Sequence, residues 1–66
     1  MTLAELIYQA RKRAGLSQEE LADRLGVTRQ AVSKWETGKS VPDTENIRRM
    51  TVVLAVSADY FLGSDS

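Results

Sequence analysis

The hydrophobic residues near the start of this 66-residue chain recur at helical spacing. Apolar side chains follow the first of them by three, four, seven and eleven positions, and the set consists of Leu3, Leu6, Ile7, Ala10 and Ala14. Residues at these intervals share one face of an α-helix and form a single apolar stripe. The residues TLAE at positions 2–5 are typical of a capping box, and Gly15 is suited to the left-handed residue that ends a helix. We therefore predict a first helix that ends near Gly15.

Two short helices are predicted next, with a very short connection between them. The first covers about residues 18–25, and the second covers about residues 28–36. Only Gly26 and Val27 stand between the end of the first of these helices and Thr28, which we expect to be the N-cap of the second. So short a connection sets two short helices at a steep angle, which is the arrangement of a helix-turn-helix. A small residue, Ala22, stands where the second of these helices must cross the first.

Two further helical segments complete the chain. One follows Pro42 and Asp43, and the other is short, with Ser57 as the expected cap and Gly63 as the expected end. No segment shows sustained alternation of apolar and polar residues between turn signals, so strands are not predicted. The pattern as a whole predicts an all-α fold of five helices.

Length and composition exclude several classes of protein. A chain of 66 residues makes one small domain, which we expect at residues 1–63 with a C-terminal tail at residues 64–66. The sequence contains no Cys and no His, so disulfides, thiol nucleophiles, imidazole bases and most zinc sites are absent. No glycine-rich phosphate loop is present either, and we predict no enzyme, no cofactor, no metal and no small-molecule ligand. No apolar run approaches the roughly 18 residues of a membrane span, so we expect a cytoplasmic protein without a membrane partner.

Charge is distributed unevenly along the chain, although the formal net charge is zero. Between residues 24 and 39, the only acid is Glu36, and it stands against the four basic residues Arg24, Arg29, Lys34 and Lys39. The segments before and after this stretch both contain more acidic than basic residues. A neutral total therefore does not exclude binding to an anion.

One face of the predicted third helix contains hydrogen-bond donors and no carboxylate. It consists of Arg29, Gln30, Ser33, Lys34 and Thr37. A cation in the first turn of a helix opposes the helix dipole at a cost of roughly 0.3–1 kcal/mol, so Arg29 indicates a use other than helix stability. Arg and Lys side chains can donate to guanine, and Gln can pair with adenine. The alternative is an ordinary solvent-exposed polar face.

The stretch LSQEELADRLGVTRQAVSKWETGKSVP resembles the phage repressor and Cro class of helix-turn-helix regulators, the XRE family. The resemblance covers about residues 3–63 and includes VSADYFLG near the end. It implies a compact, lambda-repressor-like domain of five helices whose recognition helix enters the major groove. The implied function is sequence-specific binding of a double-stranded DNA operator by a transcriptional regulator, with repression as the expected role. Thr51 departs from the family, which usually has Ala there, so its hydroxyl must find a partner in the core.

The resemblance also implies roles for individual residues. The residues expected to read bases are Arg29, Gln30, Ser33 and Lys34. Those expected to contact phosphates are Gln18, Thr28, Thr37, Lys39 and Ser40. An ion pair between Arg11 and Glu36 is expected to tie the first helix to the end of the third, because a partly buried charge needs a partner.

The last two helices contain more apolar residues than a core of this size is expected to hold. We predict that some of them form a homodimer contact, and the candidates are Val52, Val53, Val56, Tyr60 and Phe61. Members of the resembled family commonly dimerise through their C-terminal helices, which places two recognition helices roughly 34 Å apart, one turn of DNA. The alternative is that Val53 and Phe61 complete the core. A second functional reading, a protein-interaction module or antitoxin that uses the same fold, also stays open at this point.

Overall fold

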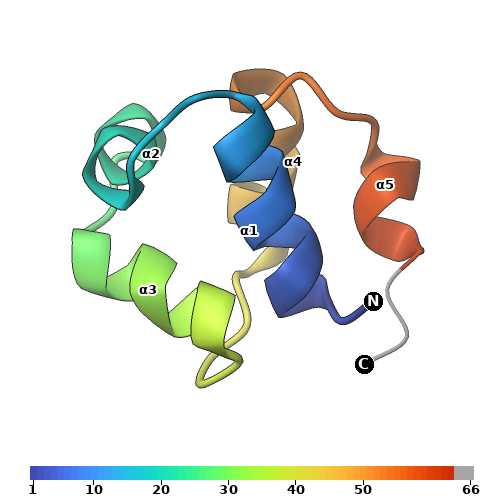
Figure 1. Cartoon of the computed structure of the whole chain (residues 1–66), viewed down its shortest axis with the longest axis horizontal. Coiled ribbons are helices and arrows are strands. Elements are labelled where there is room, and N and C mark those ends of the chain that lie inside the picture. Colours follow the sequence, from blue (N-terminus) through green and yellow to red (C-terminus); the bar gives the residue numbers. More distant parts are fainter. Residues whose placement is uncertain (64–66) are drawn as a thin grey trace.

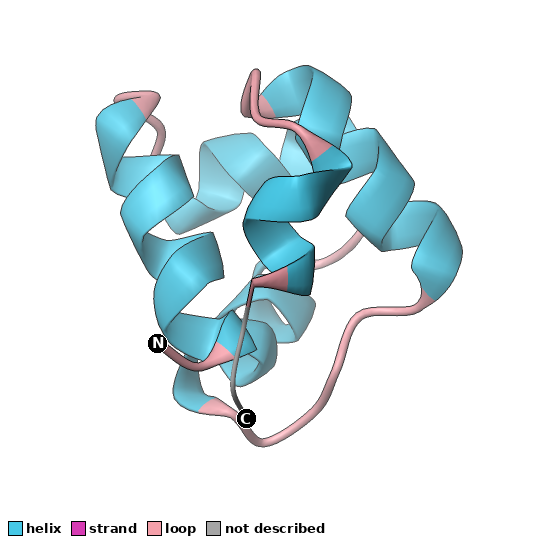
Figure 2. Cartoon of the chain, turned by 90° about the vertical axis from the view of Figure 1, so that its right-hand side faces the viewer, coloured by secondary structure: helices cyan, strands magenta, loops and turns pink. Residues whose placement is uncertain are grey.

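The computed structural model describes residues 1–63 and contains five helices joined by short loops (Figure 1). The helices are α1 (Leu3–Arg13), α2 (Gln18–Leu25), α3 (Arg29–Thr37), α4 (Thr44–Val53) and α5 (Ala58–Leu62). The described residues form helices and loops and no strand (Figure 2). The predicted all-α fold of five helices is confirmed. The predicted tail at residues 64–66 lies outside the described residues.

Polar residues begin the helices at the predicted positions. Thr2 and Ser17 each form both hydrogen bonds of a capping box, so the starts of α1 and α2 are fixed locally. The backbone N–H of Ser17 donates to Glu20 Oε1 at 2.8 Å, and this bond lowers the pKa of the Glu20 carboxyl. Asp43 caps α4 by accepting from the backbone N–H of Asn46 at 2.8 Å. Ser57 is the N-cap of α5 as predicted, but its side chain makes no capping hydrogen bond.

The turn between α2 and α3 depends on a glycine in the left-handed conformation. Gly26 has a φ of 72°, which an L-residue with a side chain rarely adopts. The next residue, Val27, donates its backbone N–H to the carbonyl of Ala22 at 3.0 Å and closes the end of α2. A side chain from α4 supports the same end, because Arg49 Nη1 donates to the carbonyl of Leu25 at 3.2 Å. The chain can therefore leave α2 and enter α3 within three residues.

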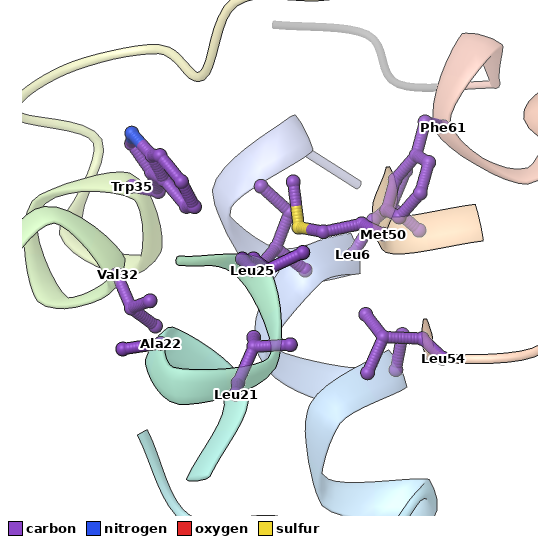
Figure 3. Packing of buried hydrophobic residues seen from close by; sticks show 11 residues of the cluster. Leu6, Leu21, Ala22, Leu25, Val32, Trp35, Met50, Leu54 and Phe61 are labelled. Atoms are coloured by element: carbon purple, nitrogen blue, oxygen red, sulfur yellow. The ribbon is translucent and has the colours of Figure 1, made fainter. Parts of the chain in front are cut away.

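The core lies where α1, α2, α3 and α4 meet, and α5 covers it from one side (Figure 1). Its buried hydrophobic residues are Leu6, Ile7, Ala10, Leu21, Ala22, Leu25, Val32, Trp35, Met50, Leu54 and Phe61. Figure 3 shows Ala22 on α2 next to Val32 on α3, and the two residues are only 3% and 0% exposed. Thr51, which is half-buried, donates its hydroxyl to the carbonyl of Arg48 at 2.6 Å. Its partner is thus in its own helix.

Of the five C-terminal apolar residues, four are at least partly buried and one is exposed, so not all of them fit into the core, as expected. Phe61 is only 4% exposed, and the partly buried residues Val53, Val56 and Tyr60 pack against the core. The Tyr60 hydroxyl also donates to the carbonyl of Leu6 at 2.8 Å, which ties α5 to α1. Only Val52 projects fully, with 79% of its surface exposed. Phe61 thus completes the core and Val53 packs against it, as in the alternative reading, and the homodimer contact stays a prediction.

Replacing Ala22 with Leu should destabilise the fold, because three extra carbon atoms would have to fit between α2 and α3. We expect Ala22→Leu to lower the free energy of unfolding by about 1–3 kcal/mol through overpacking. Urea denaturation followed by circular dichroism measures this change. The same substitution at the exposed Ala58 is the control and should change stability by less than about 0.5 kcal/mol. Equal stability of both variants would show that the two helices do not cross closely at residue 22.

Candidate nucleic-acid interface

α2 and α3 lie together at one edge of the molecule (Figure 1). The polar face of α3 is turned away from the core. Val32 and Trp35 are buried, so the residues on the opposite side of the helix face outward. Of the predicted face, Arg29, Gln30, Lys34 and Thr37 are exposed and Ser33 is half-buried. The first turn of α3 contains no acid. This face therefore presents hydrogen-bond donors to a ligand that binds there.

The start of α3 is closed by its own cap. Thr28 Oγ1 accepts from the backbone N–H of Ala31 at 3.1 Å, and Thr28 is exposed. Within residues 1–63, neither Arg29 nor Lys34 takes part in an ion pair. Arg29 thus stands in the first turn of the helix, against the helix dipole, without a carboxylate that compensates it.

Lys39 and Ser40 follow α3 and are both exposed. Their backbone N–H groups donate to the carbonyl of Lys34 at 2.9 and 3.4 Å, which closes the end of the helix. The Thr37 hydroxyl likewise donates to the carbonyl of Ser33 at 3.0 Å. Because these backbone amides are already hydrogen-bonded to the end of α3, an anion beside the loop would contact the side chains of Lys39 and Ser40.

A cleft of about 870 Å³ lies between the turn that joins α1 to α2 and the beginning of α3. Arg11, Gln18 and Arg29 are among the residues that line it. Gln18 is the first residue of α2, where backbone N–H groups lack partners within the helix. Such helix starts favour anions. The cleft therefore brings one predicted phosphate-contacting residue and one predicted base-reading residue to the same side of the molecule.

A buried ion pair joins α1 to the last turn of α3. Arg11 Nε donates to Glu36 Oε2 at 2.6 Å, and Arg11 Nη2 donates to Glu36 Oε1 at 3.0 Å. The two side chains are 8% and 3% exposed. The hydrogen bond with Glu36 raises the pKa of Arg11 above its ordinary value. Arg11 Nη1 also donates to the carbonyl of Leu16 at 2.9 Å, so the same guanidinium fixes the turn before α2.

Gln18 belongs to this network, which the sequence did not indicate. Its Nε2 donates to Glu36 Oε1 at 3.0 Å. The two residues are separated by 18 positions, and neither periodicity nor capping signals predict which side chain of α2 faces the end of α3. The structure thus brings Arg11, Gln18 and Glu36 together.

Nothing in the described part of the chain resembles a metal centre. Within residues 1–63, no group of three or more acidic side chains is placed to hold a metal ion. The longest helix, α1, has 11 residues, and none of the helices described here could cross a bilayer.

A family model described as helix-turn-helix matches residues 7–61. The chain belongs to the helix-turn-helix family. The resemblance found in the sequence is confirmed by this match, because α2 and α3 are the two helices of that motif.

Similar proteins include several transcriptional regulators. The chain is 40% identical over 58 residues to the SPbeta prophage-derived HTH-type transcriptional regulator YonR of Bacillus subtilis, which covers 88% of this chain and 54% of the relative. It is 37% identical over 65 residues to the HTH-type transcriptional activator BcrR of Enterococcus faecalis, which covers 98% of this chain and 32% of the relative. The chain thus spans about half of one relative and a third of the other.

Among solved structures, the chain is similar to the P22 c2 repressor protein in complex with a synthetic operator. The two share 32% sequence identity with a TM-score of 0.88, and the match covers 98% of each chain. The arrangement of all five helices is therefore shared with a repressor that was crystallised in complex with a synthetic operator.

Removal of Arg11 should be costly, because it leaves the buried Glu36 carboxylate without its cation. We expect Arg11→Ala to lower the free energy of unfolding by about 3 kcal/mol or more, and Glu36→Gln in the same chain to restore part of that loss. Urea denaturation of wild type, both single variants and the double variant measures the coupling.

The exposed pair between Arg48 and Glu45 provides the control, since both side chains are at least half exposed. Arg48→Ala should leave the unfolding midpoint nearly unchanged. Strictly additive effects of the Arg11 and Glu36 substitutions would contradict the energetic importance of the buried pair.

Proposed function

We propose that this protein binds double-stranded DNA in a sequence-specific way as a transcriptional regulator, with α3 as the recognition helix in the major groove. The observation that carries the proposal is the donor face of α3, which contains Arg29, Gln30 and Lys34 and no acid. Arg and Lys can donate to guanine O6 and N7, and Gln can pair with adenine N6 and N7. Ser33, which is half-buried, is the fourth candidate for a base contact. The likeness to a repressor that was crystallised with an operator supports this reading.

The proposed phosphate contacts lie on both sides of α3. Gln18 at the start of α2 and Thr28 at the cap of α3 would meet the backbone on one side of the groove. Thr37, Lys39 and Ser40 would meet it on the other side, at the end of α3 and in the loop after it. Contacts of this kind fix the register of the protein on the duplex, and the bases are read by α3.

We propose that the regulator acts as a repressor in the cytoplasm, by occupying its operator rather than by catalysis. A domain bound in the major groove excludes other proteins from the same base pairs, so an operator that overlaps a promoter would be silenced. The relatives include regulators, a repressor and an activator, and the position of the operator relative to the promoter decides between these outcomes.

We propose that the protein forms a homodimer through an apolar surface other than the one predicted from the sequence. Of the residues predicted for this contact, Phe61 is buried, Val53, Val56 and Tyr60 are half-buried and only Val52 is exposed, whereas Val41 and Leu62 are 75% and 77% exposed. Both line a cleft of about 370 Å³ together with Leu3, Pro42, Ile47 and Phe61. Val41 and Pro42 belong to the loop that follows α3, so a contact at this cleft would lie next to the end of the proposed recognition helix.

Base contacts and phosphate contacts should respond differently to substitution. The operator is first selected from random duplexes. Arg29→Ala and Gln30→Ala should then each weaken operator binding by about 1–3 kcal/mol and relax the preference at one position of each half-site, with binding to scrambled duplex nearly intact. Lys39→Ala should weaken binding to both duplexes and reduce the slope of log affinity against log salt by about one for each contact removed.

The measurement is a set of salt titrations by fluorescence anisotropy on the selected and scrambled duplexes. Equal weakening of both duplexes by Arg29→Ala and Gln30→Ala would show that α3 does not read bases. A wild-type protein that binds both duplexes equally or not at all would favour the protein-interaction alternative.

The dimer surface can be tested with two exposed apolar residues. Leu62→Glu places a charge in the cleft and should yield monomers at concentrations where the wild type is dimeric, as measured by analytical ultracentrifugation. Val52→Glu is the matched control, because Val52 is equally exposed but does not line the cleft, and it should leave the dimer intact. Dissociation by Val52→Glu alone would instead place the contact on α4.

A further inference from the structure

The carboxylate of Glu36 receives donors from two other helices. Its Oε1 accepts from Arg11 Nη2 and from Gln18 Nε2, both at 3.0 Å, and its Oε2 accepts from Arg11 Nε at 2.6 Å. The side chain is 3% exposed although it lies in the last turn of α3. One acid therefore holds side chains from α1 and α2 at the cleft beside α3.

We propose that Glu36 is a positioning residue for DNA binding, which orients the side-chain amide of Gln18 toward a DNA phosphate. This inference rests on the DNA-binding function proposed above. A primary amide is planar and has two N–H donors. Because one of them is engaged by Glu36, the direction of the other is fixed relative to α2 and α3. Gln18 is half-buried and lines the cleft, so its remaining donor can meet an oxygen of the DNA backbone.

Fixing this amide in advance should increase affinity, because a long side chain otherwise loses rotamer freedom when it binds. The hydrogen bond to Glu36 is charge-assisted and thus stronger than a bond between neutral groups. It also links the phosphate contact to the helix that reads the bases, since Glu36 belongs to α3.

An acid beside DNA would ordinarily repel phosphate, but Glu36 is compensated. Both of its oxygens accept from the guanidinium of Arg11, and the pair has no net charge. The other acids that line the cleft are Glu19, Glu20 and Asp23, and all three are exposed. Glu36 differs from them because it is buried and bonded to a residue of the proposed interface.

The experiment compares substitutions that conserve charge. Glu36→Asp keeps the carboxylate but withdraws it by one methylene, Gln18→Met removes the amide at similar length, and a third variant combines both. Each protein is titrated with the selected operator over a range of salt, at a temperature where circular dichroism shows it to be folded. Glu19→Asp is the matched control, because it is the same chemical change at an exposed acid of the same cleft.

We expect Gln18→Met and Glu36→Asp each to weaken operator binding by about 10-fold per half-site, the effect of one lost hydrogen bond to a charged group. The double variant should bind no more weakly than either single variant, because both changes remove the same contact. The salt slope should stay unchanged, since no charge is removed. Glu19→Asp should bind like the wild type.

Two results would overturn the inference. Glu36→Asp could bind like the wild type, or the losses could multiply to about 100-fold in the double variant, which would mean that the residues act independently. A wild-type protein that does not prefer its selected operator would instead refute the proposed function.

A measurement on the unmodified protein applies even if Glu36→Asp does not fold. Relaxation of the side-chain ¹⁵N amides reports their order before DNA is added. We expect the Gln18 amide to be nearly as ordered as the backbone, with an order parameter of about 0.85, and the exposed Gln30 amide to fall below about 0.6. A Gln18 amide as mobile as that of Gln30 would contradict positioning by Glu36.

Discussion

The arrangement of the first three helices depends on the need to pair a charge that is buried in a small core. Arg11 projects from α1 into the junction with α2 and α3, and its guanidinium is satisfied by Glu36 and by the carbonyl of Leu16. Without a partner, either charge would destabilise the folded state, because transfer of an ion from water is costly. The pair therefore specifies one arrangement of α1 against α3. This specification matters because a domain of 66 residues has only a small apolar core.

Local features of the fold could be predicted from the sequence because they depend on residues that are close together in the chain. Thr2, Ser17, Thr28 and Asp43 cap helices through bonds to backbone groups three residues away. The outward face of α3 could be predicted in the same way, because the apolar residues of this helix mark its buried face and the residues opposite them face outward. The ion pair of Arg11 with Glu36 was expected from the family resemblance, since its partners are 25 residues apart.

Features that depend on how helices cross could not be predicted in this way. The bond from Gln18 to Glu36 requires the angle between α2 and α3, and the bond from Arg49 to the carbonyl of Leu25 requires the position of α4. The sequence left open whether Phe61 completes the core or belongs to a contact surface, because the capacity of the core was judged from chain length. The structure places α5 against α1 and α4, where a large aromatic side chain is enclosed.

The short α5 has a consequence for the dynamics of the domain. A helix of five residues without a side-chain cap does not form alone in water, so α5 exists only while Phe61 and Tyr60 hold it on the core. Its amides should accordingly exchange with solvent through local opening, at a lower free energy than those of α1. Leu62 lies in this segment, so one wall of the proposed dimer cleft is formed by a helix that depends on its packing against the core. Association of two copies would then also stabilise the helix that builds the contact, which couples assembly to folding.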